Sequence, residues 1–195
     1  MIVLSCSGTG GHVYPAIGIG QYLKEADLMF VVEKGRVSES IVKENGYSCL
    51  SFKLSKRRLW TFLGAFFKML LFFFRHSVKV VLAFGGNATL PVVLAAYLFR
   101  IPIILFEQNA VPGRANRVLQ YFAKKICVSF EDTLPLFRKP ILVTGNPVRH
   151  QFPKDNTIDP ITNLNWRKGR KCLVFGGSQG ALAINTFVSD HYGWF

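Results

Sequence analysis

Short apolar runs that alternate with helix-like stretches constrain the fold of this chain more than any other feature of its sequence. The runs are rich in β-branched residues and lie at residues 2–5, 28–32, 78–84, 103–106, 126–129 and 141–144. Short and nearly continuous apolar runs are typical of parallel strands that are buried on both faces of a sheet. The stretches between them, at residues 15–26, 38–45, 59–74, 90–99 and 114–122, predict crossover helices. The alternation therefore predicts an α/β fold with an open parallel sheet, in which ligands bind at the carboxyl ends of the strands.

A change in composition near residue 150 predicts a domain boundary. Residues 1–150 hold all of the runs above, whereas residues 151–170 are rich in Pro, Asp and Asn and predict a linker. An apolar run at residues 172–175 lies in the segment 171–195, which predicts the first strand and helix of a second domain. Because a domain usually needs about 50 residues or more, we expect this second domain to be incomplete and the chain to be a fragment.

Glycine-rich turns follow three of the predicted strands, at residues 7–12, 85–87 and 176–180. Glycine lets backbone N–H groups approach an anion closely, and the N-terminus of a following helix adds a partial positive charge. Any one of these turns is compatible with a plain tight connection. Together they favour a diphosphate ligand, because the carboxyl ends of parallel strands share one edge of a sheet.

A dinucleotide site is an alternative interpretation of the first turn, because Glu33 follows it by about 20 residues. The glycine spacing does not fit, since Val13 stands at the third position if Gly8 and Gly10 are the first two. A nicotinamide dehydrogenase would rest on this turn and Glu33 alone, and a titration with NAD tests it.

The charge of the chain is strongly positive and unevenly distributed. The formal net charge is +13, and residues 50–125 contain a single acid, Glu107, among twelve Lys and Arg. Such asymmetry predicts an anionic partner, which is nucleic acid, a phosphate-rich ligand or an acidic membrane surface.

The segment from Arg57 to Phe74 distinguishes among these partners. Two arginines precede sixteen mostly apolar residues, a run shorter than the ~20 that a membrane-spanning helix needs. As a helix it would be apolar around most of its circumference, so it is either a core helix or a peripheral membrane patch. Nucleic acid is disfavoured, because proteins that bind single strands interleave aromatic and basic residues on a sheet or groove. The residues expected in a membrane patch are Arg57, Arg58, Trp60, Phe62, Phe66, Phe67 and Phe73.

Metal ions, disulfides and export are not predicted. The four cysteines are widely scattered without a Cys-x-x-Cys pair, which favours a reducing compartment and argues against zinc. The N-terminus has no early Lys or Arg and too short an apolar run for a signal peptide. The sequence has no Asp-x-Asp pair that would hold Mg²⁺ or Mn²⁺. We expect no metal and no cofactor.

Four segments carry a family resemblance. They are Gly8-Thr-Gly-Gly-His-Val-Tyr-Pro-Ala16, Phe106-Glu-Gln-Asn109, Gly145-Asn-Pro-Val-Arg149 and Gly176-Gly-Ser-Gln-Gly-Ala181. In this order they closely resemble the MurG family of bacterial peptidoglycan enzymes, within glycosyltransferase family 28, and the match covers essentially the whole chain. Ser7 departs from the family pattern, in which a glycine is usual, and so does the sequence from Asn87 to Thr89.

The resemblance implies a GT-B fold of two Rossmann-like domains, with the lipid acceptor on the N-terminal domain and most of the sugar nucleotide on the C-terminal one. It implies transfer of N-acetylglucosamine from UDP-N-acetylglucosamine to undecaprenyl-diphospho-N-acetylmuramoyl-pentapeptide, with inversion and without metal, at the cytoplasmic face of the inner membrane. The chain as given is expected to be inactive by itself. An alternative is a non-catalytic, membrane-bound acceptor half that works with a separate donor-binding chain.

The resemblance also implies roles for individual residues. Thr9, Gly10 and Gly11 would contact donor or acceptor phosphates, Asn109 and Arg149 the sugar nucleotide, Ser178 a donor phosphate, and Gly85, Gly86 and Asn87 the acceptor diphosphate. His12 is the candidate base, because a near-neutral imidazole can accept the proton of the attacking hydroxyl; its alternative role is a hydrogen bond to a loop carbonyl or phosphate. Glu107 is a lesser candidate and is expected to hold the loop that bears Asn109.

Overall fold

The computed structural model describes residues 1–8, 10–23, 25–55, 59–148, 174–176, 181–191 and 193. The chain divides into two compact units, Met1–His150 and Gln151–Phe195, and each is described by itself.

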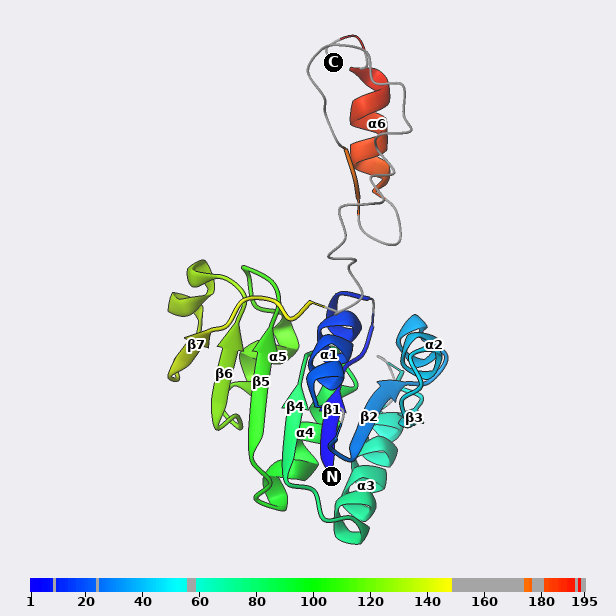
Figure 1. Cartoon of the computed structure of the whole chain (residues 1–195), viewed down its shortest axis with the longest axis vertical. Helices are drawn as coiled ribbons and strands as arrows, with labels where there is room; N and C mark the ends of the chain where they lie inside the picture. Colours follow the sequence, from blue (N-terminus) through cyan, green and yellow to red (C-terminus); the bar gives the residue numbers. More distant parts are fainter. Residues whose placement is uncertain are drawn as a thin grey trace. The chain divides into compact units, whose positions relative to one another are not determined.

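The first unit is built on one parallel sheet (Figure 1). Within the described residues the sheet has seven strands, in the order β3-β2-β1-β4-β5-β6-β7. The strands are β1 (Ile2–Ser5), β2 (Leu28–Glu33), β3 (Cys49–Phe52), β4 (Val80–Ala83), β5 (Ile103–Glu107), β6 (Lys125–Val128) and β7 (Ile141–Val143). The prediction of an α/β fold with a Rossmann-like parallel sheet is confirmed, and the order reverses between β1 and β4.

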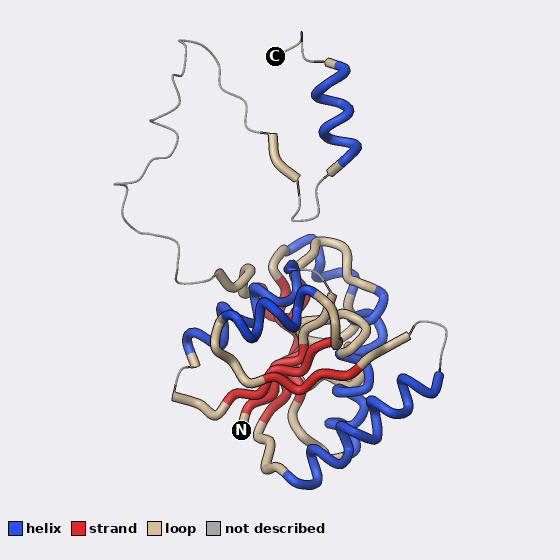
Figure 2. Tube along the Cα trace, turned by 90° about the vertical axis from the view of Figure 1, so that its right-hand side faces the viewer, coloured by secondary structure: helices blue, strands red, loops and turns tan. Residues whose placement is uncertain are grey.

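Helices cover both faces of this sheet, and Figure 2 shows the strands running between them. The helices are α1 (Gly10–Tyr22), α2 (Val37–Glu44), α3 (Leu59–Arg75), α4 (Thr89–Leu98), α5 (Arg114–Leu119) and the 3₁₀ helix η1 (Glu131–Leu136). The second unit contains α6 (Leu182–Asp190) among its described residues.

Alternate residues of the central strands point to opposite faces, and each face has its own hydrophobic core. On one face Val3 and Val81 belong to a cluster that also contains buried residues of α3, α4 and α5. On the other face Leu4 and Leu82 belong to a cluster with buried residues of α1 and α2. Burial on both faces explains why these strands have nearly continuous apolar sequences.

Elements α1 and β3 differ from the sequence-based expectation, and the 3₁₀ helix η1 was not predicted. The helix expected at residues 15–26 is α1, which begins at Gly10 and ends at Tyr22, so His12 lies in its first turn. The strand β3 was not predicted, because the sequence Cys-Leu-Ser-Phe is neither continuously apolar nor strictly alternating and the strand lies at the edge of the sheet.

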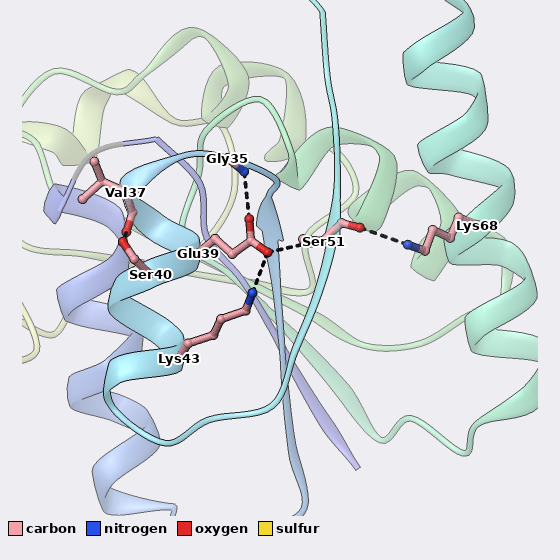
Figure 3. Close-up of polar contacts among 7 residues, drawn as sticks. All are labelled: Gly35, Val37, Glu39, Ser40, Lys43, Ser51 and Lys68. Carbon is pink, nitrogen blue, oxygen red and sulfur yellow. Dashed lines mark hydrogen bonds and ion pairs between the residues drawn. The ribbon is translucent and has the colours of Figure 1, made fainter.

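A polar network joins α2, β3 and α3 (Figure 3). The Glu39 carboxylate accepts hydrogen bonds from the Gly35 backbone N–H at 2.8 Å, from Lys43 at 2.9 Å and from the Ser51 hydroxyl at 3.1 Å. These bonds, that from Gly35 first, lower the pKa of Glu39 to about 2. Lys68 of α3 donates to the Ser51 carbonyl oxygen at 3.0 Å. The network therefore attaches α3 to the edge strand and fixes which side of this helix faces solvent.

Candidate functional site

The loops that follow β1 and β4 begin side by side at the carboxyl edge of the sheet. Ser5 pairs with Ala83 in the parallel ladder, and the Phe84 backbone N–H donates to the Ser5 carbonyl oxygen at 2.8 Å. The strand order reverses between these two strands, which is the position where open α/β sheets bind ligands. The first two predicted glycine turns therefore lie together.

The second turn adopts a conformation that only glycine takes readily. Gly85 and Gly86 have φ angles of +94° and +87°. A Cβ atom at Gly86 would overlap the hydroxyl and carbonyl oxygens of Ser7. The Ser7 hydroxyl is buried and accepts the Ala88 backbone N–H at 3.1 Å, just before α4 begins. Ser7, where the family usually has glycine, therefore links the first loop to the second.

Two helix N-termini meet this edge of the sheet, since α1 begins at Gly10 and α4 at Thr89. The first backbone N–H groups of a helix have no partners within it and carry a partial positive charge. Neither helix has an acidic residue in its first turn. Gly10 and Gly11 belong to the first turn of α1, as the predicted phosphate contacts require. This arrangement is suited to an anion such as a diphosphate.

His12 lies over both glycine turns and is half-buried. Its Nδ1 atom is 3.0 Å from the Gln108 side-chain oxygen Oε1. Its Cδ2 atom is 3.9 Å from the place of a Cβ at Gly8, and its Cε1 atom is 3.4 Å from the place of a Cβ at Gly85. Both ring carbons are bonded to Nε2, so the edge of the ring that bears this nitrogen faces Gly8 and Gly85, where the absence of side chains lets the imidazole come close.

Glu107 organises the loop after β5. Its carboxylate is 1% exposed. Oε1 accepts the backbone N–H and the side-chain amide of Asn109 at 3.0 and 2.9 Å, and Oε2 accepts the Gly113 N–H and the Asn116 amide at 3.0 and 2.8 Å. Four hydrogen bonds to one buried carboxylate hold residues 107–113 in place. This is the arrangement expected of a residue that supports the loop bearing Asn109.

Two buried polar atoms at this edge have no hydrogen-bond partner within the described part of the chain. They are Nε2 of Gln108 and Oδ1 of Asn116. The Asn116 oxygen is 3.2 Å from the place of a Cβ at Gly85, beside His12. Because unpaired buried polar groups are rare, they are informative about function. A donor and an acceptor are therefore available near the imidazole of His12.

The structure leaves several predicted site residues unplaced. Thr9, Arg57, Arg58, Arg149 and Ser178 lie outside the described residues, as do Gly177, Gln179 and Gly180 of the third glycine turn. Their roles stay predictions. Among the described residues, His12, Gly85, Gly86 and the loop of Asn109 are brought together, and Asn87 is exposed beside them.

Helix α3 presents an aromatic stripe to solvent. Trp60, Phe67 and Phe74 follow one another at intervals of seven residues and are 81%, 63% and 79% exposed. This spacing places them on one side of a helix. The inclusion of Phe73 in the exposed patch was wrong, because its side chain is 4% exposed and packs in the core. Leu71, which the prediction omitted, is exposed between Phe67 and Phe74.

The other two predicted patch residues, Phe62 and Phe66, line an apolar groove of about 390 Å³. The groove is lined by Phe62, Leu63, Phe66, Leu94, Tyr97, Leu98 and Phe122. A second cavity, of about 660 Å³, shares Tyr97, Leu98 and Phe122 with the groove and carries the bases Arg100, Lys124 and Lys139. Aromatic and basic side chains therefore adjoin on this side of the first unit.

Among the described residues, no helix combines the length and apolar character that crossing a membrane requires. No three His, Cys, Asp or Glu side chains in the same part of the chain lie together as metal ligands would.

Sequence reasoning gave no role to Gln108, Asn116 or Ser7. Gln108 lies two residues after the predicted strand at residues 103–106, so its place at the carboxyl edge could be inferred. The contact of Gln108 with His12 could not be inferred, because 96 positions separate the two residues and only the strand order brings them together.

Comparisons with known proteins agree with this architecture. The profile of the glycosyltransferase family 28 N-terminal domain matches residues 2–128. Relatives from Caldicellulosiruptor saccharolyticus and Halothermothrix orenii are each 35% identical, over 96% and 100% of this chain. Both are named UDP-N-acetylglucosamine--N-acetylmuramyl-(pentapeptide) pyrophosphoryl-undecaprenol N-acetylglucosamine transferase. The alignments cover 55% and 57% of these proteins, so the chain spans a little over half the length of the curated relatives it matches.

Solved structures show the same fold. The crystal structure of Acinetobacter baumannii MurG aligns with a TM-score of 0.68 at 26% identity, over 74% of this chain and 45% of that one. A UDP-GlcNAc 2-epimerase from Neisseria meningitidis, solved with UDP-GlcNAc, aligns with a TM-score of 0.62 at 14% identity, over 75% and 47%. The second likeness concerns the fold alone. Because the family profile matches well over half of its residues, the chain belongs to glycosyltransferase family 28.

Proposed function

We propose that this chain is the acceptor-binding half of an enzyme that transfers N-acetylglucosamine from UDP-N-acetylglucosamine to undecaprenyl-diphospho-N-acetylmuramoyl-pentapeptide. The observation that carries the proposal is the position of His12 over two glycine turns at the point where the strand order reverses. The names of relatives at about 35% identity supply the substrates. The reaction is a step of bacterial cell-wall synthesis.

In the proposed mechanism the acceptor diphosphate lies against the N-termini of α1 and α4, where the partial positive charge of each helix end attracts it. The acceptor sugar hydroxyl attacks the anomeric carbon of the donor from the side opposite the leaving group. A new C–O bond forms, the bond from that carbon to the diphosphate oxygen breaks, and UDP leaves. His12 accepts the hydroxyl proton at Nε2. The product therefore has inverted configuration, and no step requires a metal ion.

The remaining donor contacts are assigned to residues that the sequence motifs indicate. Asn109 and Arg149 would hold the sugar nucleotide, and Ser178 would bind a donor phosphate. Charge accumulates on the leaving diphosphate, so fixed N–H groups and a guanidinium are the groups that would stabilise it. We infer that turnover needs a donor-binding half, because the chain spans just over half the length of its relatives. Residues 171–195 would be the beginning of that half, after a linker at residues 151–170.

A transfer assay tests this proposal. The chain is joined to the C-terminal half of the Caldicellulosiruptor saccharolyticus relative, and this fusion is called the completed enzyme below. Labelled N-acetylglucosamine should pass from UDP-N-acetylglucosamine to the lipid-linked acceptor with the completed enzyme and not with the chain alone. Transfer by a mixture of the two separate halves would instead favour a non-catalytic acceptor subunit. A folded completed enzyme that transfers to neither lipid-linked nor soluble acceptors would contradict the proposal.

We also propose that the exposed stripe of α3 docks on the anionic cytoplasmic surface of the inner membrane. Apolar side chains beside clustered bases gain from burial in the acyl boundary and from attraction to acidic lipids. The apolar groove and the bases of the adjoining cavity lie on the same unit and support the same partner. Docking there would bring the lipid-linked acceptor to the protein.

Sedimentation with vesicles measures this docking. The chain should pellet with vesicles rich in anionic lipid and be partly released by salt, because surface charge attraction is screened. Replacing Phe67 and Phe74 together with asparagine should weaken vesicle binding by about 10-fold or more, since two exposed aromatic side chains no longer enter the lipid. Phe130→Asn is the matched control, because Phe130 is 50% exposed and lies outside α3. Equal binding of all three proteins, or indifference to lipid charge, would contradict the docking surface.

A further inference from the structure

Gln108 is the only residue that hydrogen-bonds the imidazole of His12 within the described part of the chain. The contact joins the loop after β5 to the first turn of α1, and Oε1 of the carboxamide is 3.0 Å from Nδ1. An amide oxygen accepts hydrogen bonds and cannot donate them. Nδ1 must therefore carry the hydrogen in this arrangement, and the lone pair of the neutral ring is at Nε2.

The position of the hydrogen on Nδ1 matters because of the groups that lie near Nε2. The two ring carbons bonded to Nε2 lie close to Gly8 and Gly85, and the unpaired Oδ1 of Asn116 is also next to Gly85. A hydroxyl group that approaches Nε2 at this edge of the ring would meet a lone pair rather than an N–H group.

Gln108 is itself held firmly. It is 9% exposed and stands between Glu107, whose carboxylate accepts four hydrogen bonds, and Asn109, which donates two of them. Its side-chain nitrogen has no partner in the described part of the chain, so the contact with His12 is the one hydrogen bond that the structure shows for this carboxamide. A hydrogen bond to one ring nitrogen commonly fixes which nitrogen of a functional histidine is protonated.

We propose that Gln108 is a positioning residue that keeps the hydrogen of His12 on Nδ1 and the lone pair on Nε2, at the edge of the ring that faces Gly8 and Gly85. The inference rests on the proposed function only for the use of that lone pair, which is to accept the proton of the acceptor hydroxyl. The protonated nitrogen is a property of the folded chain and can be measured without any substrate.

Nitrogen NMR of the histidine-labelled chain is the direct test, because protonated and unprotonated ring nitrogens give distinct signals. His12, assigned through a His12→Gln variant, should show a protonated Nδ1 and an unprotonated Nε2 when the ring is neutral. Gln108→Leu removes the acceptor at nearly constant volume and should let the ring populate both forms. The matched control is Gln120→Leu, another buried glutamine with hydrogen bonds to Arg117 and Arg138, which should leave the His12 signals unchanged.

Activity of the completed enzyme is the second readout. Gln108→Leu should lower turnover about 10-fold to 100-fold, the range measured for residues that orient a metal-bound imidazole. Gln108→Glu keeps an acceptor opposite Nδ1 and should stay within a few-fold of the original enzyme, while Gln120→Leu should do the same. A wild-type His12 protonated on Nε2, or signals that Gln108→Leu does not change, would overturn the proposal. If the NMR result holds and no enzyme transfers N-acetylglucosamine, the proposed function fails while the role of Gln108 stands.

Discussion

Replacing His12 with alanine should reduce the turnover of the completed enzyme by about 100-fold or more, because general base catalysis typically contributes a factor of 10² to 10⁴. The ring lies close to both glycine turns, and the edge that bears Nε2 faces Gly8 and Gly85. The loss should be in kcat, since the proton is transferred only as the new bond forms. Initial rates at saturating donor and acceptor, measured in detergent, give this comparison.

His76→Ala is the matched control for that experiment, because His76 lies at the end of α3 and outside the glycine turns. It should retain nearly the full rate. A decrease of only a few-fold in His12→Ala, with an unchanged unfolding midpoint, would remove the base role. His12 would then be a residue that hydrogen-bonds a phosphate or the Gln108 loop.

Replacing Gly86 with alanine should destabilise the first unit by roughly 2–5 kcal/mol. A left-handed φ costs a non-glycine residue about 1–2 kcal/mol, and overpacking typically costs a further 1–3 kcal/mol. Both costs apply at Gly86, whose φ is +87° and whose Cβ would overlap two oxygens of Ser7. Urea unfolding followed by circular dichroism measures the difference.

Gly35→Ala separates the two costs. Gly35 has a φ of +74° but nothing within 4 Å of its Cβ position, so only the backbone term applies there. We expect a loss of about 1–2 kcal/mol for this variant. Equal losses at the two positions would show that the close approach of the Gly86 loop to Ser7 is not as the structure has it.

The strands were predictable because they are buried on both faces. β1 was expected at residues 2–5 and is found at Ile2–Ser5, and β4 occupies the centre of the expected run. A strand that is covered on both faces needs apolar residues at nearly every position, so its sequence is continuously apolar. β3 was missed because Ser51 interrupts its apolar sequence, whereas the other edge strand, β7, was predicted from a continuous apolar run although Leu142 and Val143 are exposed.

The first residue of α1 and the side of α3 that faces solvent were harder to predict. Pro15 suits the first turn of a helix, so the sequence indicated a start there. In the structure α1 begins at Gly10, and Pro15 lies inside the helix. In α3 almost every position is apolar, so the sequence alone does not distinguish buried Phe73 from exposed Phe74. The packing of α3 against α4 and the attachment of Lys68 to β3 decide between them.

The candidate site was predictable as a place and not as a set of contacts. Glycine turns after two strands indicated the carboxyl edge, and the reversal of strand order puts both at one point. The pairing of His12 with Gln108, and of Ser7 with the turn before α4, depends on loops far apart in the sequence. No local pattern carries that information.

The central claim is that the carboxyl edge between β1 and β4 holds the diphosphate of the acceptor. The most direct test is an NMR titration of the isotope-labelled chain with a water-soluble acceptor that has a short prenyl chain. The signals of Gly8, His12, Gly85 and Gly86 should shift together and saturate, while those of Asp27 and Gly46, before β2 and β3 at the opposite edge, should stay in place. Saturable shifts at Asp27 and Gly46, with none at the glycine turns, would contradict the account.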